Sequence, residues 1–164
     1  MKKAFIIIGI GILSIVGFVV WSGYSSTQAN QKELSQLIAE PKAVIVASAT
    51  CGCCKLYGQY MKEQGFTVDF RSVSQEEADG YKDTNEIPAN LRSCHTTRIG
   101  DYVIEGHIPM EAITKLLKEK PSVKGIALPG MPSASPGMPG PKLEPFEIRI
   151  ITNDGKDGGI FIKL

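Results

Sequence analysis

The chain has 164 residues, which is enough for one domain with terminal extensions. Its 18 lysines and arginines almost balance its 17 aspartates and glutamates. This even charge, without a basic stripe or an acidic tail, argues against a nucleic-acid partner.

The N-terminus carries an uncharged apolar segment. Lys2 and Lys3 precede residues Ala4 to Trp21, which as a helix would extend roughly 27 Å, about one hydrocarbon core. The two lysines place its start in the cytoplasm. We predict a retained membrane anchor over residues 4–21, with a cleaved signal peptide as the alternative. Both place the rest of the chain in an oxidising periplasmic or other extracytoplasmic compartment, and the lack of a cysteine before Cys51 excludes a lipoprotein anchor.

Between residues 32 and 120, helical and extended patterns alternate. Residues 43–48 form an apolar run typical of a buried parallel strand, and residues 66–73 alternate apolar and polar side chains. In chain order we expect a tether at 22–31, a helix at 32–40, a strand at 43–48, a helix at 55–64, a strand at 66–73, a helix at 75–81, an irregular segment at 85–91, a hairpin formed by 97–99 and 102–106, and a helix at 110–120.

The composition changes after Lys124. Residues 128–141 contain five prolines and the methionines Met131 and Met138, so neither a helix nor a central strand is expected there. Residues 146–151 and 159–164 then predict a second hairpin, whose apolar faces need to pack on the sheet or on the loop.

The order of these elements predicts an α/β protein of the thioredoxin-like class, β-α-β-α-β-β-α. The expected organisation is an anchor or signal segment with its tether at 1–29, a thioredoxin-like metal-binding domain at 30–125, a Pro/Gly/Met-rich loop at 126–142 and a C-terminal β-hairpin packed on the domain at 143–164. In this topology Cys94 passes over the N-terminus of the helix at 55–64, and His107 leaves the second strand of the 97–106 hairpin at the same sheet edge.

Three thiols lie where the first strand turns into that helix: Cys51, Cys53 and Cys54. The unpaired N–H groups and the positive end of the helix dipole favour thiolate over thiol at this position. A thiolate binds soft metals and attacks disulfides. The position therefore predicts a chemical function for these sulfurs.

Three functions other than a copper cluster are alternatives for these cysteines, and the spacing suits the last of them, a single zinc ion, poorly. Structural disulfides would best pair Cys51 with Cys54 and Cys53 with Cys94, because adjacent cysteines form strained rings. A thiol–disulfide oxidoreductase would use Cys51 and Cys54. A single zinc ion would need Cys53 and Cys54 to point the same way, although neighbours on a helix diverge by about 100°.

Several copper ions that share thiolates remove this difficulty, because each sulfur then faces a different ion. Cu(I) is soft, and each ion offsets one thiolate charge. We therefore favour more than one Cu(I) per chain. The predicted ligands are the four cysteines first and the histidines and loop methionines second: Cys51, Cys53, Cys54, Cys94, His95, His107, Met131 and Met138.

The motifs also resemble a known family. Residues 51–54 (CGCC), 93–96 (SCHT), 102–109 (YVIEGHIP) and the 129–138 segment (PGMP through SPGM) are similar to the CopG-type periplasmic copper-resistance proteins over residues 42–164. The resemblance implies a thioredoxin-like fold, a multinuclear copper–thiolate cluster on the four cysteines, and a role in copper resistance and homeostasis. It also implies possible exchange between Cu(I) and Cu(II), an oxidoreductase activity, and copper efflux or chaperone proteins as partners.

Overall fold

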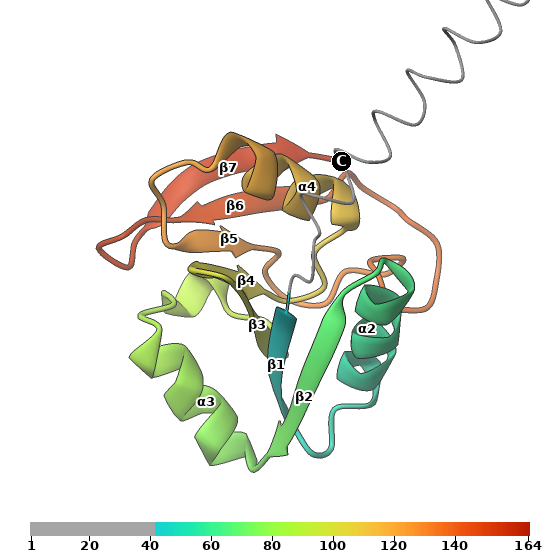
Figure 1. Ribbon diagram of the computed structural model, residues 1–164. Coiled ribbons are helices and arrows are strands. Elements are labelled where there is room, and N and C mark those ends of the chain that lie inside the picture. Colours follow the sequence, from blue (N-terminus) through green and yellow to red (C-terminus); the bar gives the residue numbers. More distant parts are fainter. Residues whose placement is uncertain (1–41) are drawn as a thin grey trace, which may run out of the picture. The chain divides into compact units, whose positions relative to one another are not determined.

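The computed structural model describes residues 42–164 (Figure 1). The predicted anchor at 4–21, the tether and the helix at 32–40 lie outside these residues. Within them, the chain forms a mixed α/β fold with three α-helices and a seven-stranded sheet in the order β2-β1-β3-β4-β5-β6-β7. No helix in the described part of the chain is long and apolar enough to cross a membrane.

The first half of the sheet follows the predicted order of elements. Strands β1 and β2 are parallel, β3 pairs antiparallel with β1, and β4 pairs antiparallel with β3. The bounds are β1 Lys42–Ser48, α2 Gly52–Glu63, β2 Thr67–Val73, α3 Gln75–Thr84, a short 3₁₀ helix Ala89–Leu91, β3 His95–Ile99, β4 Tyr102–Glu105 and α4 Met110–Glu119.

Helices α2 and α3 cover opposite faces of this half of the sheet (Figure 1). Helix α2 buries Cys54, Tyr57 and Met61, a spacing of three to four residues that forms one face of a helix. Helix α3 begins at a capping box, in which Ser74 accepts a hydrogen bond from the Glu77 backbone and Glu77 binds back to the Ser74 backbone.

The second half contains a strand that sequence patterns did not predict. Strand β5, Gly125–Ala127, pairs parallel with β4. Gly125 allows this pairing, because a Cβ atom there would lie only 1.8 Å from the carbonyl oxygen of Val103. The predicted C-terminal hairpin is present as β6 Glu147–Ile151 and β7 Asp157–Lys163, and it joins the sheet edge to edge through β5.

Helix α4 lies over this C-terminal half of the sheet (Figure 1). Its buried stripe is Ala112, Ile113 and Leu116, and its Lys115 ammonium lies 5.3 Å from the ring centre of Phe161 on β7. Helix α4 thus contacts β7, while Ile151 of β6 packs in a buried cluster with Ile87 and Leu91.

Candidate metal centre

The N-terminus of α2 positions three of the four sulfurs. Cys51 is the residue that caps the helix, and Cys53 and Cys54 lie in its first turn, where α2 has no acidic side chain. Cys54 is fully buried whereas Cys53 is partly exposed, because successive helical residues point in different directions. The helix therefore presents one sulfur to the core and one towards solvent.

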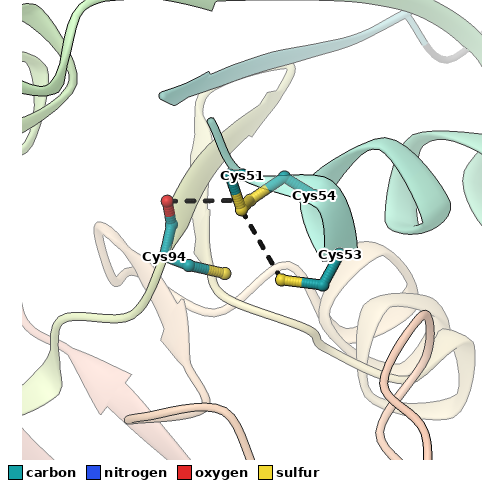
Figure 2. Close-up of side chains that lie close together, drawn as sticks. All are labelled: Cys51, Cys53, Cys54 and Cys94. Carbon is teal, nitrogen blue, oxygen red and sulfur yellow. Dashed lines mark hydrogen bonds between the residues drawn. A yellow bond between two sulfur atoms is a disulfide. The ribbon is translucent and has the colours of Figure 1, made fainter. Parts of the chain in front are cut away.

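Cys51 and Cys54 form a disulfide, with their α-carbons 5.4 Å apart, while Cys53 and Cys94 are free thiols (Figure 2). The Cys53 sulfur lies 3.5 Å from that of Cys51. The structure thus contains one of the two disulfides of the structural alternative and lacks the other. A disulfide sulfur is not a thiolate, so a set of four thiolates exists only after two-electron reduction.

Strand β3 brings the fourth sulfur back to the helix. The Cys54 sulfur lies 3.8 Å from the backbone oxygen of Cys94, and the sulfurs of all four cysteines lie within 4.8 Å of one another (Figure 2). The topology thus gathers residues that are forty positions apart in sequence.

The free Cys94 thiol holds its proton tightly. Burial is the main cause, and the neighbouring Cys53 adds to it, so that the pKa of Cys94 is raised to about 12, although the charge of Lys82 opposes the shift. At neutral pH this thiol is protonated. A metal ion that binds here must displace the proton, as it does at other cysteine sites.

Two buried histidines lie against Cys94. Its sulfur is 3.3 Å from Nδ1 of His95 and 3.0 Å from Nε2 of His107. Nδ1 of His107 donates a hydrogen bond to the carbonyl oxygen of Pro136 at 2.7 Å, which leaves the Nε2 lone pair directed at the sulfur. Burial lowers the pKa of both histidines, so near neutral pH they are neutral imidazoles, the form that binds metals.

The Pro/Gly/Met-rich loop crosses the first turn of α2. At Gly137 the backbone has a φ of +82°, and a Cβ atom there would lie 2.8 Å from the Tyr57 nitrogen and 3.1 Å from the Cys53 oxygen. Met138 is the next residue along and is partly buried, whereas Met131 is 52% exposed. A role for either methionine as a ligand stays a prediction.

We expect Gly137→Ala to lift this loop from α2, because the added methyl would meet backbone atoms in a conformation that disfavours side chains. The free energy of unfolding should fall by about 1–3 kcal/mol, and the hydrogen bond between Pro136 and His107 should be lost. Gly130→Ala is the matched control: Gly130 has a φ of +68° with nothing within 4 Å of the added Cβ. Urea unfolding measures the stability of both variants, and histidine NMR signals report the His107 hydrogen bond in each. Equal losses in the two variants would contradict the prediction.

A buried ion pair anchors the chain segment that carries Cys94. Lys82 on α3 and Glu105 on β4 have side chains 4% and 0% exposed, with 2.6 Å between Nζ and Oε1. Glu105 also accepts hydrogen bonds from the backbone nitrogen of Ser93 at 2.7 Å and from the hydroxyl of Thr96 at 2.6 Å. The pair therefore holds the residues on both sides of Cys94 and His95. Sequence analysis missed it, although Lys82 follows the buried Ala78 at helical spacing.

Comparison with known proteins adds a family to this geometry. Residues 91–138 match the model of a family described as a protein of unknown function, DUF411. None of the curated proteins matches the chain. Two solved structures, entitled copper resistance protein CopG form 1 and form 2, are similar to it, with TM-scores of 0.67 and sequence identities of 31% and 29%. Each comparison covers 76% of this chain and 98% of the CopG chain.

A cluster of cysteines and histidines at one edge of a mixed α/β sheet defines a candidate metal-binding protein. Because it is 31% identical to a CopG structure over 98% of that chain, this protein belongs to the CopG-type copper-resistance family.

Proposed function

We propose that this chain is an extracytoplasmic copper-binding protein that holds several Cu(I) ions on Cys51, Cys53, Cys54 and Cys94 and contributes to copper resistance. The observation that carries the proposal is the mutual approach of the four sulfurs within 4.8 Å. Membership of the CopG-type family supports copper as the metal. The proposal includes a thioredoxin-like arrangement, which the strand order β2-β1-β3-β4 and the position of α2 support. It also includes membrane anchoring by residues 4–21, which is tested by membrane fractionation of the full chain.

Several soft monovalent ions suit this sulfur set better than one divalent ion. Cys54 is buried and Cys53 is partly exposed, so the two sulfurs approach the site from different directions. Thiolates that bridge neighbouring ions tolerate this divergence, and each Cu(I) offsets one negative charge. The neutral imidazoles of His95 and His107 would complete the ligand set, and the loop with Met131 and Met138 would cover the site or pass copper to a partner.

The disulfide gives this site a redox step. A dithiol reductant can reduce the Cys51–Cys54 bond: it gives up two electrons and two protons, becomes a disulfide itself, and leaves two thiols on the chain. In the reverse direction, two Cu(II) ions each accept one electron while these thiols lose two protons and form the disulfide again, so that two Cu(I) ions result. The step needs no other oxidant. It gives the chain a route between the two copper states.

Metal analysis tests the proposal. Chain purified under reducing conditions from copper-fed cells should contain more than one copper per molecule. One zinc ion per molecule would overturn the proposal in favour of a mononuclear site.

We expect Cys53→Ser to lower the number of Cu(I) ions bound by the reduced protein while the fold stays intact. The residue is partly exposed and free, so the free energy of unfolding should change by about 0.5 kcal/mol or less. Gly52→Ala is the matched control, because it adds a methyl in the same helical turn where nothing lies within 4 Å. Copper analysis and circular dichroism measure both changes. An unfolded Cys53→Ser protein would instead indicate a structural thiol.

A second function, thiol–disulfide exchange, is favoured by the disulfide at the N-terminus of α2. A substrate dithiol would be oxidised to its disulfide as Cys51–Cys54 is reduced to two thiols. Refolding of a scrambled disulfide substrate tests this function. Activity that survives Cys94→Ser but is lost in Cys51→Ser would favour exchange over copper binding.

A further inference from the structure

Two groups of close ligand atoms meet at Cys94. One consists of the four cysteine sulfurs, and the other consists of Cys94, His95 and His107, with all three ligand atoms within 4.8 Å of one another. Cys53 belongs to the first group only, and the two histidines belong to the second only. The Cys94 sulfur is therefore the one atom common to both sets.

The second group has the dimensions of a site for one ion. The sulfur lies 3.3 Å from Nδ1 of His95 and 3.0 Å from Nε2 of His107. A sulfur and a nitrogen bound to one ion at about 2.0–2.3 Å are separated by about 3.5–3.7 Å at trigonal or tetrahedral angles, so small outward shifts of the two rings make room for the ion. The two rings are close to perpendicular, at 85°, with their centres 4.8 Å apart, and the sulfur contacts Nδ1 of one and Nε2 of the other.

The surroundings hold these ligands in place. The Pro136 carbonyl fixes the proton of His107 on Nδ1, a second contact of the kind that orients metal-binding histidines. His95 is fully buried, its ring centre lies 4.5 Å from that of Tyr57, and its Nε2 has no hydrogen-bond partner among the described residues. The only polar contact of the His95 ring among these residues is thus the one from Nδ1 to Cys94.

The disulfide separates the two groups chemically. Closing Cys51–Cys54 removes two of the four thiolates from the first group, whereas Cys94 stays free and the second group stays complete. We propose that the disulfide form of this protein binds one Cu(I) ion on the Cys94 sulfur, His95 Nδ1 and His107 Nε2. The proposal rests on the proposed function for the identity of the metal, and on the structure for the ligand set.

Three ligand atoms and a buried environment favour Cu(I) over zinc. Thiolate and imidazole are ligands that copper accepts, and zinc prefers a fourth ligand in a tetrahedral site. A site of this kind would let the chain retain one copper ion after oxidation has opened the four-sulfur set. The shared sulfur would keep that ion adjacent to the position where the others bind after reduction.

The test uses full-length Cys53→Ser protein in its disulfide form, so that Cys94 is the only free thiol. Cu(I) stabilised in acetonitrile is added without oxygen and without a thiol reductant. We expect one copper per chain and an X-ray absorption spectrum that fits two nitrogen ligands and one sulfur. His107→Gln in the same background should weaken Cu(I) binding by at least about 10- to 100-fold. Circular dichroism checks that this variant is folded. The X-ray absorption spectrum of the Cys53→Ser protein tests the ligand set independently of the His107→Gln variant.

The outcomes separate this proposal from the proposed function. No copper in the disulfide form, a spectrum with sulfur ligands alone, or displacement of the copper by equimolar zinc would overturn the three-ligand site. Several copper ions in the reduced protein would leave the proposed function standing in each of these cases. One copper on two nitrogens and one sulfur, together with no more than one in the reduced protein, would support this site and overturn the four-sulfur cluster.

Discussion

Cys94→Ser should abolish copper binding by the disulfide form and reduce the copper content of the reduced protein to at most one ion per chain. The Cys94 sulfur belongs to both groups of ligand atoms, whereas the other free thiol, Cys53, belongs to one. A serine hydroxyl is a hard, neutral ligand and does not replace a soft thiolate for Cu(I). Cys53→Ser, by contrast, is expected to affect only the reduced form. Copper analysis of the two forms, prepared separately, measures the effect.

The fold should survive this change. Cys94 is partly exposed and free, so the unfolding free energy should move by about 1 kcal/mol or less. Cys53→Ser is the matched control, since it exchanges the same atoms and should leave the disulfide form with one copper. A Cys94→Ser protein that still binds several copper ions would contradict the shared role of this sulfur.

The apolar patterns between residues 42 and 119 predicted the main elements for two reasons: helices α2 and α4 each bury one face, and β1 is buried along most of its length. The prediction missed β5, because Gly125–Ala127 is too short to show an alternation of apolar and polar residues. Its first residue is a glycine, which lets the backbone come close to Val103 but adds no side chain to the pattern. Without β5, the sequence indicated that the C-terminal hairpin needed a partner but not that it extends the sheet.

Local spacing and the predicted topology were sufficient to bring the four cysteines of the candidate site together. The turn before α2 placed three cysteines, and the return of β3 placed Cys94 beside them. Spacing also indicated Cys51–Cys54 as the pair that the disulfide alternatives would use, and the structure contains this bond. The carbonyl of Pro136 that orients His107 depends instead on a tertiary contact that leaves no pattern in the chain. The Lys82–Glu105 pair joins α3 to β4, and for isolated charged residues the usual expectation is a solvated surface.

Lys82→Met should destabilise the protein by about 3–5 kcal/mol, the usual cost when one partner of a buried ion pair is removed. The loss leaves the Glu105 carboxylate buried without a counter-charge, although Ser93 and Thr96 still donate to it. Urea unfolding at neutral pH measures the effect. Lys156→Met is the matched control, because Lys156 pairs with Asp154 at 2.7 Å and has a side chain 77% exposed, so its loss should leave the stability almost unchanged.

Acid should partly rescue the Lys82→Met variant. Burial already raises the pKa of Glu105 in the native chain while Lys82 opposes the shift, so removing the lysine raises this pKa further. A carboxyl whose pKa is higher in the folded state binds more protons there than in the unfolded state. Its folded state therefore gains stability as the pH falls through the folded pKa towards the unfolded value. The difference in stability from the native chain should narrow between pH 7 and about pH 5, and a difference that stays constant would contradict an unpaired buried carboxylate as its cause.

Replacing both charges separates the ion pair from simple packing. In Lys82→Met/Glu105→Gln no charge remains buried. The amide oxygen can still accept a hydrogen bond from the Ser93 backbone nitrogen, and the amide NH2 group can donate one to the Thr96 hydroxyl. Much of the lost stability should return, because buried pairs often contribute little relative to neutral replacements. Copper binding adds the functional measurement: if the pair serves to hold the Cys94 segment in position, the double variant should recover copper affinity together with stability. Recovered stability with copper affinity still lost would show instead that the lysine charge itself acts on the Cys94 thiol.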